Sequence, residues 1–141
     1  MSLSGGMARI LFPLVLGTLA APVQAPGLIP GLYELTTTGA NTALSSSTRA
    51  CISAKRAQGA FARPLPAAGC RMEKDLVSGG RIEIVMRCGP ADHGHSLTEI
   101  TGAYTERTFE IRTRTLGSAG GSPREMRVTT QGRRLGGLCT L

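Results

Sequence analysis

The chain has 141 residues, of which 41% are hydrophobic and 18% are charged, and this balance suits one globular domain rather than a disordered chain. Aromatic residues make up only 4% and tryptophan is absent, which argues against a surface that stacks nucleic-acid bases. The single apolar run, near the N-terminus, is too short for a protein that spans a membrane several times.

Residues 1–25 are expected to form a cleaved export signal. Arg9 precedes a short apolar run, and small residues follow as far as Ala25. The run is too short to cross the hydrocarbon core, so the sequence predicts a periplasmic or secreted protein that does not span the membrane. Cleavage after Ala20 and cleavage after Ala25 both fit this pattern. The mature chain is then a single domain over 26–141.

The chain is basic, with a formal net charge of +7, or +6 once the leader and Arg9 are removed. An exported protein meets little nucleic acid, so the expected partners of this charge are anionic envelope components such as membrane headgroups, lipopolysaccharide and acidic proteins. Arg112, Arg114 and Arg127 alternate with apolar residues on late segments and are the candidate partner-binding residues. The mouth of a curled sheet is a second candidate surface. The alternative is that these arginines form a solvated face that keeps the domain soluble.

Four cysteines in an exported chain, Cys51, Cys70, Cys88 and Cys139, predict two disulfides. Residues 70–77 and 81–88 alternate in polarity around Ser78-Gly79-Gly80, which is typical of a β-hairpin.

Strand register then selects the cysteine pairs. A three-residue loop places Cys70 opposite Cys88 and keeps one face apolar except for Lys74, with Asp75 opposite Glu83 on the solvent face. A two-residue loop would instead place Leu76 against Glu83, so the sequence favours the longer loop. Cys70–Cys88 is therefore predicted as a cross-strand disulfide, and Cys51–Cys139 follows by elimination.

The remaining segments predict a mainly β fold. Alternation and turn residues indicate an antiparallel up-and-down meander of about seven short strands that curls into a sheet or half-barrel, with one short helix covering an open end. Outside the hairpin, the expected elements are strands over 32–38, 45–51, 95–104, 108–116 and 125–131, a helix over 54–58 capped by Ser53, and a loop over 117–123.

The sequence contains few groups that suggest catalysis. It lacks a Gly-x-Ser-x-Gly nucleophile motif and a phosphate-binding loop, so we expect a protein that is not an enzyme and needs no cofactor. His93 and His95 would project to the same side of an extended segment and are the candidate metal ligands, for Zn or Cu. Met72 and Met86 could add soft thioethers. The alternative is that the histidines are solvated loop residues and the methionines fill the core.

The order of several short motifs resembles a known family. Residues 30–34 (Pro-Gly-Leu-Tyr-Glu) with a following threonine run, the first three cysteines, and residues 132–136 (Gly-Arg-Arg-Leu-Gly) before Cys139 are similar to exported bacterial proteins catalogued as domain of unknown function thirty-six-seventeen. The resemblance covers about residues 28–139. The family usually has tryptophan where Tyr33 stands, and its late strands are often rich in methionine. It implies export and disulfides but no activity, so the expectation is a non-enzymatic binding or structural domain of the cell envelope, or alternatively a periplasmic metal-binding protein.

Overall fold

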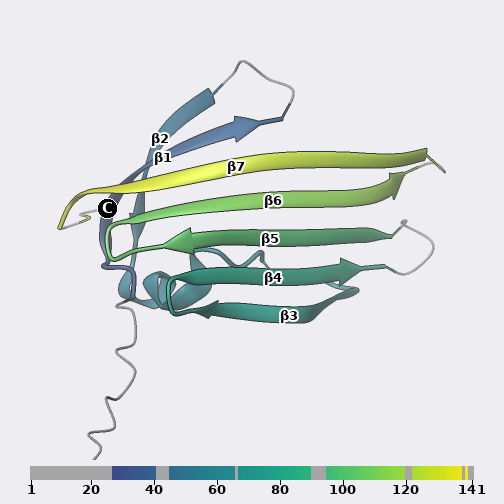
Figure 1. The fold of residues 1–141 in the computed structure, drawn as a ribbon, viewed down its shortest axis with the longest axis horizontal. Helices are drawn as coiled ribbons and strands as arrows, with labels where there is room; N and C mark the ends of the chain where they lie inside the picture. Colours follow the sequence, from purple (N-terminus) through teal and green to yellow (C-terminus); the bar gives the residue numbers. More distant parts are fainter. Residues whose placement is uncertain are drawn as a thin grey trace, which may run out of the picture.

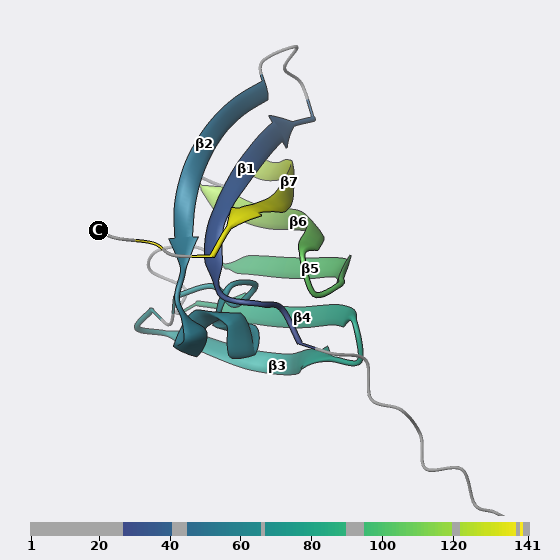
Figure 2. The same cartoon turned by 90° about the vertical axis from the view of Figure 1, so that its left-hand side faces the viewer.

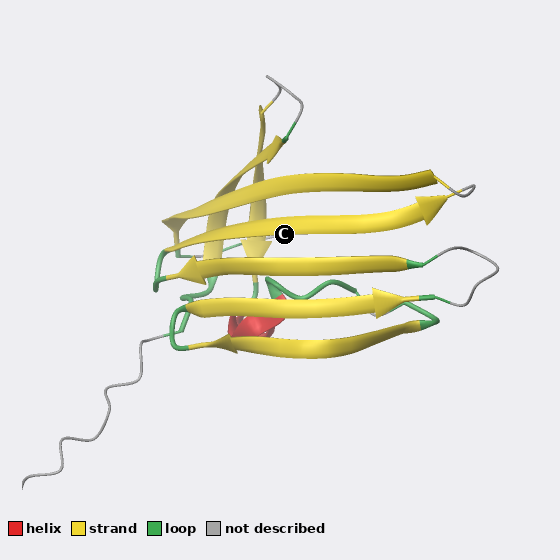
Figure 3. Ribbon diagram, turned by 45° about the vertical axis from the view of Figure 1, so that its right-hand side comes forward, coloured by secondary structure: helices red, strands yellow, loops and turns green. Residues whose placement is uncertain are grey.

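The computed structural model describes residues 27–40, 45–65, 67–89, 95–119, 122–137 and 139. The predicted leader over 1–25 lies outside these residues. The described chain confirms the mainly β, antiparallel prediction, with seven strands in one sheet and one short helix (Figure 3). The elements are β1 (Gly31–Gly39), β2 (Ser45–Ile52), η1 (Arg56–Ala60), β3 (Cys70–Ser78), β4 (Arg81–Cys88), β5 (Ser96–Tyr104), β6 (Thr108–Ala119) and β7 (Ser122–Gly136).

The strands lie in the order β2-β1-β7-β6-β5-β4-β3 (Figure 1). Strands β3 to β7 pair in sequence as a meander, and the β1–β2 hairpin continues the sheet beyond β7. Consecutive strands β2 and β3 therefore lie at opposite edges of the sheet, and η1 belongs to the segment that connects them. Figure 2 shows that the sheet is open and curled, with β1 and β2 bending toward the side where η1 lies.

Alternation along the strands gives the sheet two chemically different faces. The core face, which η1 and the end of β2 cover, carries the apolar side chains, and Tyr33, Ile82 and Ile84 on it are almost completely buried. Ile100 and Ile111 extend the same cluster across β5 and β6. The opposite face, here named the ion-pair face, carries nearly all of the charged strand residues. Burial of the aliphatic side chains supplies the main driving force for folding.

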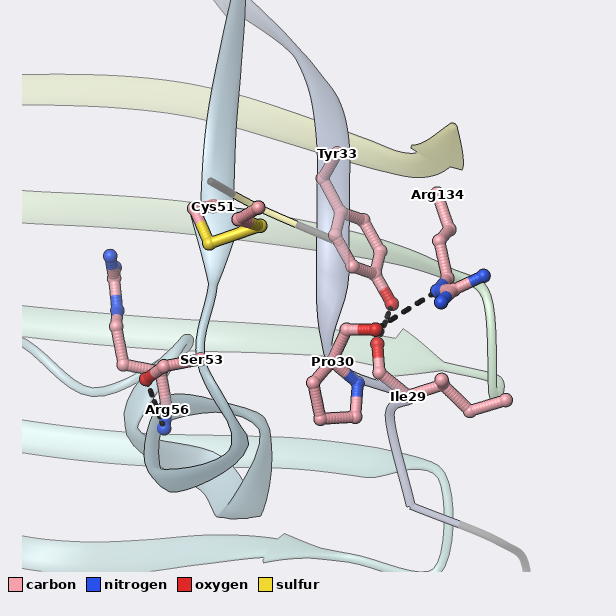
Figure 4. The surroundings of a disulfide bond; sticks show 8 residues. Ile29, Pro30, Tyr33, Cys51, Ser53, Arg56 and Arg134 are labelled. Carbon is pink, nitrogen blue, oxygen red and sulfur yellow. Dashed lines mark hydrogen bonds between the residues drawn. A yellow bond between two sulfur atoms is a disulfide. The ribbon is translucent and has the colours of Figure 1, made fainter. Parts of the chain in front are cut away.

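The short helix lies in the predicted region, although η1 (Arg56–Ala60) is displaced by two residues from the expected 54–58. The backbone N–H of Arg56 donates to Oγ of Ser53 at 3.3 Å, so Ser53 caps the first turn (Figure 4). Gly59 adopts a φ of +118° inside η1, and a conformation of this kind favours glycine. Ala57 and Ala62 then pack into the core beside Ile52. The connecting segment thus covers the end of the curled sheet, as expected.

Tyr33 anchors the start of β1. Its hydroxyl donates to the carbonyl of Ile29 at 2.5 Å, and Nε of Arg134 donates to the carbonyl of Pro30 at 3.1 Å (Figure 4). The Tyr33 ring lies 6.0 Å from that of Phe109. Burial raises the pKa of Tyr33, against the opposing effect of nearby arginines, so its hydroxyl stays neutral and able to donate.

Both predicted disulfides are present. Cys70 and Cys88 are directly opposite each other at one end of the β3–β4 pair. Cys51, on β2, bonds to Cys139 across a sequence separation of 88 residues. In the chain-entropy model a loop of that length contributes about 4 kcal/mol to stability. The second bond therefore ties the end of the chain to an edge of the sheet.

The predicted three-residue loop of the β3–β4 hairpin is wrong. Ser78 pairs with Arg81, so the loop is the two residues Gly79 and Gly80, both with positive φ as a tight hairpin turn requires. A β-bulge between Met72 and Lys74 then absorbs one residue and restores the register that aligns the cysteines.

The bulge also changes which residues share a face. Lys74 lies on the ion-pair face and bonds to Glu83, instead of interrupting the apolar face as predicted. Asp75 lies opposite Ile84 on the core face, where it pairs with Arg63 at 2.8 Å. A single inserted residue therefore gives each of these charges an ionic partner.

The predicted loop over 117–123 is also wrong for most of its length. Strand β6 continues to Ala119 and β7 begins at Ser122, with Gly117 paired to Arg124 and Ser118 to Pro123. Residues 120–121 lie outside the described chain. Cross-strand pairing overrides the low intrinsic strand preference of glycine and serine here. As a result β6 and β7 are the longest strands, and they form the middle of the ion-pair face.

Candidate functional site

The arginines predicted to bind a partner lie together on the ion-pair face, on strands β6 and β7. They line an open groove of about 910 Å³ over strands β3 to β7, here named the arginine groove. Small side chains such as Thr101 and Thr129 form its floor. Its charged lining consists of Lys74, Arg81, Glu83, Glu99, Arg112, Arg114 and Arg127.

Strand pairing brings these side chains together. Arg114 lies opposite Glu99 on β5 and opposite Arg127 on β7, so its neighbours on both sides are charged. Nε of Arg114 bonds to Glu125 at 2.8 Å and Nη1 to Glu99 at 3.1 Å. Nε of Arg127 reaches the same Glu125 oxygen at 2.5 Å. Two arginines of the groove therefore share one carboxylate.

Arg112 occupies the next position on the same face of β6. Its guanidinium pairs with Glu110 at 2.5 Å through Nη2, and 71% of the side chain remains exposed. The corresponding exposed fraction is 62% for Arg127 and 43% for Arg114. All three arginines are therefore reachable from solvent, although each already has an ionic partner.

The ion pairs hold both partners in their charged forms. Hydrogen bonds with Glu125, and then with Glu99, raise the pKa of Arg114. Arg114 first, and Arg127 second, lower the pKa of Glu125 by hydrogen bonding. The groove is therefore a fixed array of charges at neutral pH. Exposed pairs of this kind add little to stability, because water and salt screen them.

Sequence reasoning missed two cations of the groove, Lys74 and Arg81. Both pair with Glu83, and Lys74 makes the larger contribution to the lowered pKa of that carboxyl. Lys74 could not be placed because the bulge at Glu73 reverses its face. Arg81 alternates with Ile82 and Glu83 at the start of β4, and this alternation was the signal that could have placed it on the same face as Glu83.

Cations outnumber carboxylates in the ion pairs of this face. Among the described residues, eight cations share six carboxylates in nine ion pairs, and the tenth pair, Arg63–Asp75, lies on the core face. The cations are Arg71, Lys74, Arg81, Arg87, Arg112, Arg114, Arg127 and Arg133. The pairing therefore leaves this face with a net positive charge.

The groove has the chemistry of an anion site. The ion pair of Arg127 uses Nε and that of Arg112 uses Nη2, so other N–H groups of both guanidiniums remain as donors for a ligand oxygen. The planar fork of arginine matches the geometry of phosphate and carboxylate oxygens. An anionic ligand would compete with Glu125 for Arg114 and Arg127.

The predicted metal ligands are only half described. His93 lies outside the described residues, whereas His95 is exposed and its ring lies over Gly89. Among the residues that the structure describes, no three His, Cys, Asp or Glu side chains are grouped to hold a metal ion. Met72 and Met86 are direct cross-strand neighbours, as predicted, and Met72 is 41% exposed.

The described part of the chain contains no helix that is long and apolar enough to cross a membrane. No curated protein and no solved structure matches the chain. The family model for a protein of unknown function, DUF3617, matches residues 28–139, which include all seven strands and all four cysteines. The chain belongs to this family.

Proposed function

We propose that the protein is a non-enzymatic, exported domain of the cell envelope that binds phosphate-bearing headgroups through the arginine groove. The observation that carries the proposal is the gathering of Arg112, Arg114 and Arg127, with Lys74 and Arg81, in one open groove. These residues come from four strands, so only the folded sheet places them together.

Two observations support export. The two disulfides belong to a class of bond that persists in oxidising compartments and is rare in the cytosol. Residues 1–25 combine a charged start, an apolar run and small residues, in the order that an export signal requires. The envelope in turn offers a dense supply of anionic headgroups.

The groove favours phosphate because the guanidinium groups of arginine form paired hydrogen bonds with phosphate oxygens. Glu99 and Glu125 hold the arginines in place before a ligand arrives, so less side-chain freedom is lost on binding. The binding energy is mainly electrostatic and the site is open to water, so affinity must fall as salt rises.

The test is binding of the mature protein to vesicles at low and at high salt. Phosphatidylglycerol vesicles are expected to retain the protein at low salt and release it at high salt, and neutral phosphatidylcholine vesicles are expected to retain little at either. Equal retention by the two lipids, retention that does not respond to salt, or no retention at all would sink the proposal.

A further inference from the structure

A second hollow lies on the ion-pair face, over strands β1, β7, β6 and β5. It measures about 470 Å³, is here named the polar hollow, and has a polar lining of Glu34, Thr36, Thr108, Glu110, Gln131 and Arg133. Ala103 lines it as well and lies directly between Glu110 and Arg81 on the neighbouring strands. The short side chain of Ala103 leaves space between these two longer ones. The polar hollow is therefore a recess in the charged surface and is separate from the apolar core.

Strand pairing places the polar hollow next to the arginine groove. Thr36, Gln131 and Glu110 form one row across β1, β7 and β6, because each lies directly opposite the next. Thr129 and Arg112, which line the groove, are paired in the next row on the same face. Such rows are about 7 Å apart along a strand. A ligand that is bound by Arg112 would therefore reach the polar hollow with the group attached to its phosphate.

Glu110 connects the two sites. One of its carboxylate oxygens pairs with Arg112 of the groove, and the other accepts from the amide nitrogen of Gln131 at 3.0 Å. That bond uses one N–H of the Gln131 amide, and an amide carries a second N–H and an oxygen acceptor as well. The carboxylate therefore orients Gln131 beside the groove, with donor and acceptor groups for a ligand.

The pair at the other side of the hollow is loose. Arg133 and Glu34 are 3.6 Å apart, a separation that permits attraction but is too long for a hydrogen bond. The side chain of Arg133 is 68% exposed. Thr36 and Thr108 add hydroxyl groups, which can donate and accept. The polar hollow thus offers donors and acceptors from three neighbouring strands.

The charge of the polar hollow limits what can bind there. Among its described lining residues, the two carboxylates of Glu34 and Glu110 outnumber the one cation, Arg133. A second phosphate would therefore be repelled. Hydroxyl groups are uncharged and can both donate and accept, so they match a mixed set of carboxylate, amide, guanidinium and hydroxyl partners. A ring with several hydroxyls beside one phosphate fits the hollow and the groove together.

We propose that the headgroup bound by the protein is a phosphorylated sugar, with its phosphate in the arginine groove and its hydroxyls in the polar hollow. This inference rests on the proposed function and specifies the ligand of the same site. Glu34, Gln131 and Thr36 are then specificity-determining residues, and Gln131, in the middle of its row, contributes most to the preference. A site built to bond hydroxyls discriminates against a ligand that lacks them.

The test is a titration of the isotope-labelled mature protein with three small phosphates, followed by the chemical shifts of its backbone amides. Glucose-6-phosphate and glycerophosphate carry the same charge, but only the first has a hydroxyl-bearing ring, and phosphoethanolamine carries an ammonium instead. We expect glucose-6-phosphate to bind several-fold more tightly than either of the others, with shifts at Gln131 and Glu110.

Two results would overturn the inference and leave headgroup binding by the groove intact. They are equal affinity for glucose-6-phosphate and glycerophosphate, and tighter binding of phosphoethanolamine. Failure of all three compounds to bind would also overturn it, while retention by phosphatidylglycerol vesicles decides the proposed function separately.

Two matched variants locate the preference. Gln131→Met keeps the length of an exposed side chain and removes its amide, so we expect a several-fold loss of preference for glucose-6-phosphate, unchanged affinity for glycerophosphate and a wild-type circular dichroism spectrum. Gln58→Met makes the same change at an exposed position of η1, outside the hollow and the groove, and should alter neither affinity. A preference that survives Gln131→Met, or that falls equally in both variants, would contradict the role of the polar hollow.

Discussion

The two faces of the sheet are built from the same strands but differ in what they contribute. The core face buries Ile82, Ile84 and Ile100 almost completely, whereas the ion-pair face exposes paired charges to water. Burial of an aliphatic side chain is worth far more to stability than an exposed ion pair. The core face therefore supplies most of the stability of the domain, which leaves the ion-pair face free to carry a charge pattern for binding.

Shortening a core side chain should produce the largest effect. Ile84→Ala leaves a cavity where the side chain is 1% exposed, and we expect it to lower the free energy of unfolding by about 2–5 kcal/mol. Urea unfolding followed by circular dichroism measures the loss. Val85→Ala, the adjacent position on the ion-pair face, is the control, and an equal loss there would break the distinction between the faces.

Enlarging a core glycine should have the next largest effect. A Cβ atom at Gly132 would overlap the ring of Phe109, its cross-strand partner, so we expect Gly132→Ala to cost about 1–3 kcal/mol. Gly136→Ala, at a position with no atom within 4 Å of the new Cβ, should be close to neutral. Similar urea midpoints for the two variants would show that Phe109 does not need the space above Gly132.

Removing one buried hydroxyl tests the anchor at the start of β1. Tyr33→Phe loses the hydrogen bond to the Ile29 carbonyl and keeps the ring, and we expect a loss of about 1 kcal/mol in unfolding free energy. Hydrogen exchange at Ile29, whose N–H bonds to the Glu106 carbonyl, should speed up in the same variant. Wild-type stability and exchange would mean that ring packing alone holds this strand.

The ion-pair face should give the smallest change, and one that depends on pH. Arginine or lysine partners lower the pKa values of Glu73, Glu83 and Glu125 below the ordinary 4.5. Their contribution to stability is therefore complete above about pH 4.5 and is lost as the pH falls through the lowered values. The thermal midpoint is expected to drop slightly over this range, and less in a variant with glutamine at all three positions. A midpoint that rises on acidification would contradict the assignment.

Much of this division could be predicted from the sequence, because alternation shows which residues share a face of one strand. It correctly placed Cys70 opposite Cys88 and Arg112 and Arg114 on the same face. It could not place Lys74. The hairpin can form either with a two-glycine turn and a bulge or with a three-residue loop and no bulge, and which arrangement has the lower free energy depends on the residues of both strands.

Strand order and strand length were harder to predict for the same reason. The threonine-rich β1 could pair with several neighbours, and its attachment to β7 depends on a register set by residues about a hundred positions later. Likewise Gly117 and Ser118 have weak strand preference and become strand only because β7 lies beside them. The local alternation of residues predicted which side chains share a face of a strand, and long-range strand pairing determined the order of the strands in the sheet.

The most direct test of the account is vesicle binding by two triple variants with the same loss of charge. The first replaces Arg112, Arg114 and Arg127 with glutamine in the groove, and the second replaces the exposed cations Arg49, Lys55 and Arg56 outside it. The account predicts that the groove variant loses binding to phosphatidylglycerol vesicles with a urea midpoint close to wild type, while the second variant keeps most of the binding. Equal loss in both would show that net charge, rather than the groove, attracts the protein, and unfolding of the groove variant would contradict the division between the two faces.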